Sequence, residues 1–214
     1  MRTLILCVLL LVARAGCANE VPAARVNGVE IGVLRLERHF SEYLEAQGRA
    51  LASIRNPTLY KRLRDQALDE LIDKELLWQE SQRRGIAISD EQVSDQVGQV
   101  EASFGSPAIF EQRLAQAGFT RAEYADYTRH ELAAQQVYAQ LSEVAEPTQA
   151  DVAAFYQANR QMLQGLQNQS DSTSVIPEQG LDVARAALIG QRQGQARQTV
   201  RQRLRESATV EIAN

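Results

Sequence analysis

The stretch Leu68–Gln99 constrains the fold most, because it contains the end of one amphipathic helix and the start of another. In the first helix, apolar residues recur at three- and four-residue steps, on one helical face: Leu68, Leu71, Ile72 and Leu76. Gly85 follows two arginines, which is typical of a helix C-terminus. Ser89 with Gln92 three residues later predicts a capping box for the second helix.

Similar patterns predict helices along most of the chain. The composition agrees, since 44% of the 214 residues are hydrophobic and only 12 Gly and 5 Pro interrupt them. Further capping pairs are Thr120 with Glu123 and Thr148 with Asp151. Helices are expected over residues 33–47, 57–84, 89–104, 107–117, 120–144, 148–159 and 181–207. No fixed repeat supports a solenoid.

Two short β signals lie at opposite ends of this helical chain. Asn27-Gly28 stands between β-formers over residues 26–31, which predicts a tight hairpin. A two-stranded hairpin is not stable alone. The other strand-like run is residues 209–212, so we expect the C-terminal strand to pair with the N-terminal hairpin.

Residues 1–16 have the three parts of a secretory signal peptide. A short charged start precedes an apolar run, and Ala13-Arg14-Ala15 provides a cleavage site near Ala15. The run is about half the roughly 20 residues that a membrane span requires. Without this segment the chain has 21 basic and 27 acidic residues, a net charge of −6, which argues against nucleic-acid binding.

Cys17 is the single cysteine after the predicted signal peptide, so an intramolecular disulfide is excluded. Residues 11–17 partly resemble a bacterial lipobox, with Ala15-Gly16 before Cys17, but Arg14 stands where such motifs have Leu. Two outcomes therefore stay open. Either the protein is soluble after cleavage, or Cys17 is a lipid attachment site and the protein is a membrane-anchored lipoprotein.

No catalytic, cofactor-binding or metal-ligating pattern is found. His39 has no patterned nucleophile nearby, and His130-Glu131 lacks the second histidine of a metalloprotease motif. The acidic residues of 65–75 alternate with Lys61, Arg64 and Lys74, which favours a solvated, salt-bridged helix face. The carboxylates concerned are Asp65, Asp69, Glu70, Asp73 and Glu75.

Four segments, in order, resemble the N-terminal chaperone region of the SurA and PrsA type of exported, parvulin-linked (PpiC-like) foldases. They are VNGVEI (26–31), LDELIDKELLWQESQRRGIAISDEQV (68–93), FEQRLAQAGFTRAEY (110–124) and PTQADVAAFYQAN (147–159). The closing ARQTVRQRLRESATVEI is similar to the returning helix and strand of that module. The resemblance implies a mainly α, SurA-N/trigger-factor-like chaperone module with a small β-hairpin that the C-terminal strand joins.

The resemblance also implies a domain organisation. It predicts a first chaperone part over residues 24–160, a flexible linker over 161–180 and a returning helix and strand over 181–212. In the family a parvulin prolyl isomerase domain is inserted before the returning helix. The Ser/Gln/Asn-rich linker is far shorter than a domain of roughly 100 residues, so we expect the module without its isomerase.

The implied function is an exported, ATP-independent holdase in the periplasm that binds its clients through an apolar helical cradle. Its partners would be unfolded or nascent envelope and outer-membrane proteins, with no nucleic acid, small-molecule substrate or cofactor. Alternatives are a peptidyl-prolyl cis-trans isomerase and a dedicated assembly or secretion accessory protein. Client-contact residues are unknown, although Trp78, Tyr60, Tyr124 and Tyr127 fit either a client groove or the core. A domain-swapped dimer is expected if residues 181–212 extend away from the N-terminal helices.

Overall fold

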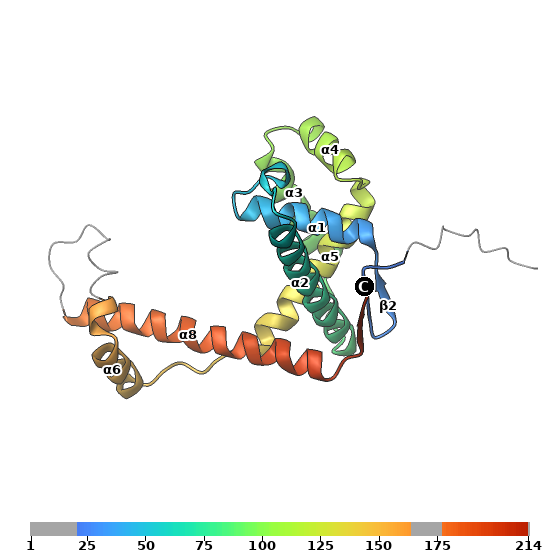
Figure 1. The fold of residues 1–214 in the computed structure, drawn as a ribbon. Coiled ribbons are helices and arrows are strands. Elements are labelled where there is room, and N and C mark those ends of the chain that lie inside the picture. Colours follow the sequence, from blue (N-terminus) through green and yellow to red (C-terminus); the bar gives the residue numbers. More distant parts are fainter. Residues whose placement is uncertain (1–20, 164–176, 214) are drawn as a thin grey trace, which may run out of the picture.

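The computed structural model describes residues 21–163 and 177–213. Figure 1 shows an upright body with one long helix, α8, extending from its base and a short helix, α6, at the far end. We call α8 the arm. The body contains β1 (Ala24–Val26), β2 (Val29–Ile31), α1 (Val33–Ala46), η1 (Leu51–Ser53), α2 (Pro57–Arg83), α3 (Asp90–Ser103), α4 (Pro107–Gln116), α5 (Arg121–Leu141) and β3 (Val210–Ile212). The remaining elements are α6 (Gln149–Ala158) and α8 (Pro177–Glu206).

The sheet joins the two ends of the chain, as predicted. Its strand order is β2-β1-β3, and both pairings are antiparallel. Asn27 and Gly28 both have positive φ, which is the geometry of a two-residue type I′ turn. Asn27 also accepts a hydrogen bond from the backbone N–H of Thr209 at 2.9 Å. The turn residue therefore holds the beginning of β3 as well as the hairpin.

One face of the sheet and two helices form the main core. Val26 and Ile31 are fully buried against α1 and α2, which contribute Phe40 and Ile72. The opposite sheet face has Arg25 and its ion-pair partner Glu30 in solvent. The hairpin, which is too small to be stable alone, is thus covered by the helices that the amphipathic pattern predicts.

The helix ends follow the capping signals of the sequence. Capping boxes are present at Ser89, Thr120 and Thr148. Gly85 has φ +68 at the end of α2, which a residue with a side chain rarely adopts. Asn56, which the sequence reading does not assign as a cap, accepts hydrogen bonds from the first turn of α2.

The segment between α6 and α8 differs in extent from the predicted linker, residues 161–180. Residues 160–163 are helical, and Leu163 is fully buried. At the other side, α8 begins at Pro177, earlier than the predicted Leu181. On the α6 side, Leu163 packs in an apolar cluster with Val152 and Leu188, which accounts for the added helical residues. Residues 164–176 lie outside the described residues, and the division of the chain into two chaperone parts stays a prediction.

Candidate functional site

The C-terminal half of the arm is fixed to the body by apolar contacts. Val200 is buried in a cluster with Leu77 of α2 and Val137 of α5, and Leu204 packs against the same cluster. Tyr138 of α5 adds polar contacts, because its hydroxyl accepts from Arg201 at 3.1 Å and donates to the carbonyl of Arg197 at 3.3 Å. The arm therefore emerges from the seam between α2 and α5.

Arg205 fixes the same end of the arm by charge. Its Nε donates to Asp73 at 2.5 Å, and its Nη1 and Nη2 donate to the carboxylate and the carbonyl of Asp69 at 3.0 and 2.8 Å. Lys74 pairs with Glu131 of α5 at 2.8 Å. Of the charges predicted to form a salt-bridged face on α2, Lys61 pairs with Asp65 four residues on within the helix, as the pattern suggests.

Other charges of this face join helices that are distant in sequence. Arg64 pairs with Glu37 of α1 at 2.8 Å. Glu75 is buried, unlike the solvated carboxylate that its spacing predicts, and it accepts from Arg35 and Gln79 at 3.3 and 3.0 Å. Burial of a charge requires such partners. The ion pairs of these residues therefore link one helix to another.

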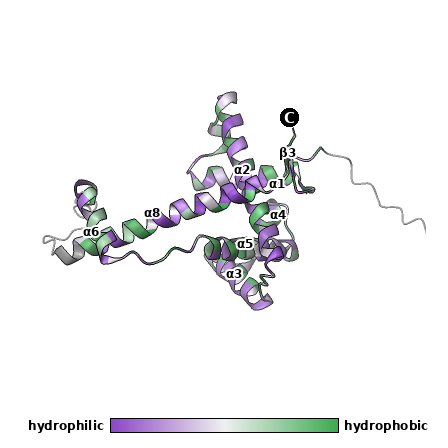
Figure 2. Ribbon diagram, turned by 90° about the horizontal axis from the view of Figure 1, so that it is seen from below, coloured by the Kyte–Doolittle hydropathy of each residue, from purple (hydrophilic) through white to green (hydrophobic). Residues whose placement is uncertain are grey.

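The middle of the arm is exposed to solvent. Between Gly190 and Thr199 no residue is buried, and only Arg192 and Ala196 are half-buried. The helix is continuous there, so this exposed segment stays helical without packing against the body. Figure 2 shows hydrophilic and hydrophobic residues distributed along α8, as expected for a helix with packed ends and a solvated centre.

The far end of the arm packs on α6 and residues 160–163, and we call this unit the distal lobe. Its buried apolar residues are Val152, Leu163, Ala184 and Leu188. The packing is close, since a Cβ at Gly180 would lie 3.1 Å from the Tyr156 ring. Arg192 extends the contact by pairing with Asp151 at 3.1 Å. The distal lobe thus has a small core of its own.

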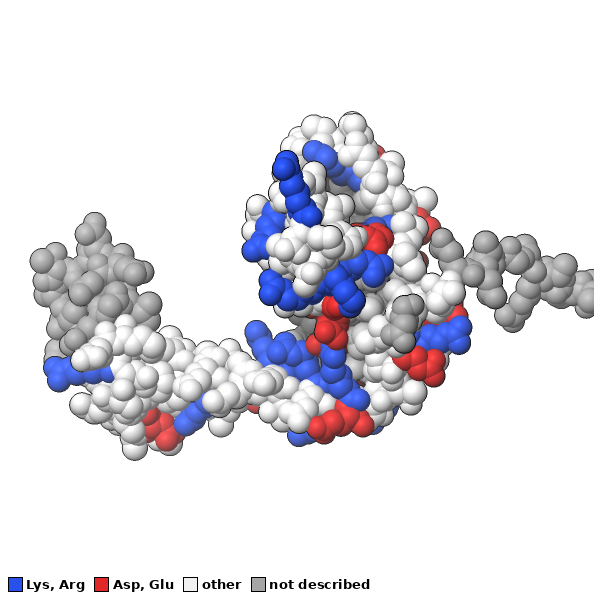
Figure 3. Space-filling view, in the orientation of Figure 1, with Lys and Arg blue, Asp and Glu red and all other residues white. Residues whose placement is uncertain are grey.

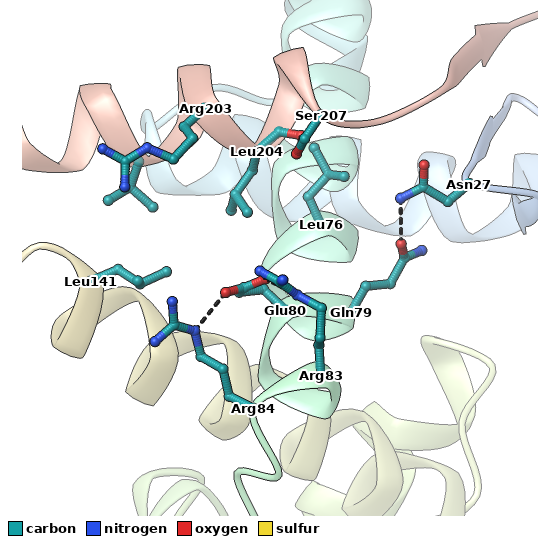
Figure 4. A pocket seen from close by; sticks show the side chains of 11 residues that line it. Asn27, Leu76, Gln79, Glu80, Arg83, Arg84, Leu141, Arg203, Leu204 and Ser207 are labelled. Carbon is teal, nitrogen blue, oxygen red and sulfur yellow. Dashed lines mark hydrogen bonds and ion pairs between the residues drawn. The ribbon is translucent and has the colours of Figure 1, made fainter.

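A pocket of about 580 Å³ lies where the arm meets the body, and we call it the junction pocket. Figure 4 shows side chains from α2, α5 and α8 around it, and Figure 3 shows basic side chains gathered along the meeting line of arm and body. Its lining residues are Asn27, Leu76, Gln79, Glu80, Arg83, Arg84, Leu141, Val200, Arg203, Leu204 and Ser207. Apolar and basic groups are therefore side by side.

Glu80 organises the basic residues of the junction pocket. This buried carboxylate accepts from Arg83 Nε at 2.8 Å and from Arg84 Nε at 2.5 Å. Burial acts to raise the pKa of Glu80, but the hydrogen bonds from Arg84 and Arg83 outweigh it, so the pKa lies below its ordinary value. Glu80 therefore stays ionised at neutral pH and holds both guanidinium groups in place.

The predicted aromatic candidates lie mostly in packing contacts. Tyr60 meets Phe40 edge to face at 5.3 Å, and Tyr124 and Tyr127 both contact Phe119. Trp78 of α2 stacks on His130 of α5 with ring centroids 3.8 Å apart. Of the two predicted roles, a client groove or the core, these contacts favour the core for Tyr60 and Tyr124, which pack against buried clusters. The Trp78 stack lies at the surface, because His130 is exposed.

A second, smaller cavity of about 150 Å³ lies at the seam between α1 and the Phe119 region. Arg38 bridges this seam, because its Nη2 donates to the carbonyl of Gly118 at 2.8 Å and its guanidinium carbon lies 4.3 Å from the Phe119 ring centroid. His39 is buried beside it, with Nε2 3.2 Å from Glu70. His39 therefore lies at the interface between α1 and α2.

Other predicted features can be located only in part. Cys17 and the predicted signal peptide lie outside the described residues. Within residues 21–163 and 177–213, no group of three or more His, Cys, Asp or Glu side chains is placed to hold a metal ion. No helix in those ranges is both long enough and apolar enough to cross a membrane.

The fold defines a class before any relative is considered: a mainly helical module with a terminal three-stranded sheet and a projecting arm. The SurA-like N-terminal domain family model matches residues 3–138, more than half of the chain. The chain therefore belongs to the SurA-like N-terminal domain family, which is a family of chaperones.

Solved structures agree at the level of the fold. Ten chains match, and one comes from a study of the virulence factor PEB4 and the periplasmic protein Cj1289, two structurally related SurA-like chaperones of Campylobacter jejuni. That match has a TM-score of 0.53 and 12% sequence identity, and it covers 90% of this chain and 99% of the other. A search of the curated proteins gives no match.

Proposed function

We propose that this protein is an exported, ATP-independent holdase that binds unfolded envelope proteins, including outer-membrane proteins, in the periplasm. The observation that carries the proposal is the SurA-like module itself, in which an arm projects from a helical body. An extended client segment can contact both parts at once. The signal-peptide pattern of residues 1–16 supports the proposed compartment.

Exposed apolar side chains on both parts support this mode of binding. Leu34, Phe104 and Ile109 are exposed on the body, and Met162 and Leu181 are exposed at the distal lobe. They are spread over α1, the region from the end of α3 to the first turn of α4, and the two edges of the distal lobe. Many weak and separated contacts suit a holdase, because area alone does not give tight binding and a holdase must release its client.

Light scattering tests the proposal directly. The mature protein is mixed with a chemically unfolded outer-membrane protein on dilution from denaturant. We expect aggregation to be suppressed at several-fold molar excess, and less well by a variant with Met162→Gln and Leu181→Gln. Gln193→Ala on the exposed middle of the arm is the matched control. Absence of suppression by the unchanged protein would contradict the proposed function.

Two further measurements separate this function from its alternatives. A proline-limited peptide assay should show an unchanged isomerisation rate at high protein concentration, whereas acceleration would indicate a prolyl isomerase. A pull-down from envelope extract should recover several β-barrel precursors, whereas one stoichiometric partner would indicate a dedicated assembly or secretion factor.

Mass spectrometry of the exported protein tests its maturation. We expect a new N-terminus near Ala15 and periplasmic recovery after cell fractionation. Acylated Cys17 would instead show a mass increase that Cys17→Ala removes, together with recovery in the membrane fraction.

A further inference from the structure

The junction pocket has a surplus of positive charge on a protein whose overall formal charge is −4. Arg83, Arg84 and Arg203 line it, and Glu80 is its one carboxylate. Glu80 is directed inward and is buried, whereas the side chains of Arg83 and Arg84 are 74% and 44% exposed. The charged groups that are accessible to a ligand are therefore the guanidinium groups of the arginines.

The two guanidinium groups at Glu80 keep donors available. Each guanidinium has five N–H donors in a fixed fork. Arg84 uses its Nε on Glu80, and Arg83 uses Nε and Nη2. No other hydrogen bond of these two guanidinium groups is found within residues 21–163 and 177–213. Glu80 thus orients both groups while their remaining donors stay free for an anion.

Arg203 comes to the pocket from the arm. It is exposed and forms no ion pair with another described residue. Figure 4 shows Arg203 on α8 and Arg84 at the end of α2 on opposite sides of the space beside Leu141. Donors from arm and body therefore converge on one region.

The same pocket has an aliphatic lining. Leu76, Leu141, Val200 and Leu204 contribute to it from α2, α5 and α8. A ligand that contacts both the arginines and the aliphatic side chains must have an anionic group and an apolar group close together. The polar side chains of Asn27, Gln79 and Ser207 complete the lining, and each is engaged within the protein, since Asn27 donates to Gln79 and Ser207 donates to the carbonyl of Leu204.

We propose that the junction pocket binds the C-terminal residue of an unfolded polypeptide through its free α-carboxylate and its apolar side chain. This inference rests on the proposed chaperone function. A terminal residue presents both groups from one Cα atom. In an extended chain, by contrast, the side chains next to an internal Asp or Glu point to the opposite face, so an apolar group on the same face is two residues away.

Fluorescence anisotropy with a short peptide, labelled at its N-terminus and ending in leucine, tests the inference. We expect the free acid to bind roughly tenfold more tightly than the same peptide with a C-terminal amide, from charge-assisted hydrogen bonds that solvent partly screens. A third peptide, amidated and with an internal glutamate, should bind like the amide. The difference between acid and amide should shrink as salt is raised.

Variants locate the site. Arg203→Glu should remove most of the preference for the acid, and Arg203→Gln should remove part of it. Neither change breaks an ion pair among the described residues, so folding is expected to be retained. The matched control is Arg62→Gln, an exposed arginine near the other end of α2, about 30 Å away along the helix axis. It should leave the preference unchanged.

Equal binding of the acid and the amide would overturn the inference, and so would an internal glutamate that binds as tightly as the free acid. Unchanged preference in Arg203→Glu would overturn the assigned position. These results are distinct from failure of the holdase proposal, because suppression of aggregation is measured separately. A protein that suppresses aggregation but shows no preference for the acid keeps the proposed function and loses this site.

Discussion

The body and the distal lobe differ in the number of buried apolar residues that stabilise each of them. The largest core of the body joins the sheet to α1 and α2, with Val26, Ile31, Leu36 and Ile72 among its fully buried members. The core of the distal lobe has four buried residues. Between them the arm is exposed. Because cooperative units of a protein can open independently, we expect the distal lobe to open at lower free energy than the body.

The largest expected effect is a cavity in the body. Phe40 is 1% exposed, and Phe40→Ala should lower the free energy of unfolding by about 3–5 kcal/mol. Urea titration followed by circular dichroism measures it. Leu51→Ala, at a residue that is 50% exposed, is the control and should change stability by less than about 0.5 kcal/mol. Equal effects of both changes would contradict the assigned core.

A cavity in the distal lobe should act locally. Leu163 is fully buried, and Leu163→Ala should destabilise the lobe by about 2–4 kcal/mol with little effect on the body. Hydrogen exchange is the appropriate measurement, since protection should be lost in α6 and in residues 180–188 and kept in α2. If the unfolding midpoint of the whole protein falls as far as in Phe40→Ala, body and lobe form one cooperative unit and the comparison is wrong.

The charged attachment of the arm should contribute less. Arg205→Gln removes the contacts to Asp69 and Asp73, and we expect a loss of about 1 kcal/mol because the guanidinium is partly exposed. The loss should diminish at high salt. A double-mutant cycle with Asp73→Asn isolates the pair. Additive effects of the two changes would show that the Arg205–Asp73 pair contributes no coupling energy to the attachment.

The smallest expected effect is a pH dependence within the body. Partial desolvation of the ring, which stacks on Trp78, and the nearby charge of Arg35 lower the pKa of His130 below its ordinary value of 6.5. The unfolded chain then binds the proton more tightly, so the stability from neutral His130 is present above pH 6.5 and is lost as the pH falls below it.

Trp78 provides the measurement for this prediction, because it is the single tryptophan and it stacks on His130. Protonation of the imidazole should quench its fluorescence with a midpoint below pH 6.5. His130→Gln is the control and should remove the transition. Protection of the distal lobe against hydrogen exchange should not follow this titration. A midpoint at or above 6.5 would contradict the lowered pKa.

Local features of this fold could be predicted from the sequence. Ser89, Thr120 and Thr148 have partners three residues on, and Asn27-Gly28 has no good alternative to a tight turn. Each of these signals depends only on neighbouring residues. The pairing of the C-terminal strand could also be predicted, since a two-stranded hairpin requires a third strand or a covering helix.

The candidate site could not be predicted in the same way. The spacing of Glu80, Arg83 and Arg84 is that of an ordinary helix end. The position of Arg203 beside them depends on the packing of α8 against α2 and α5, which the sequence does not indicate. The contact of Arg205 with Asp69 spans 136 residues. Leu163 adjoins a polar segment, so its burial has no local signal. Such features depend on how helices meet rather than on periodicity.

The strand order β2-β1-β3 has a consequence for synthesis. Asn27 and Thr209 are 182 residues apart, so β1 gains its second neighbour only after the 181 residues between them have been made. A copy that ends before Thr209 leaves one edge of β1 open, and an open edge is a template for pairing with other chains. Pairing of β3 therefore completes the sheet only in a copy that reaches Thr209. A truncated copy would expose the edge of β1 and would itself resemble an unfolded client.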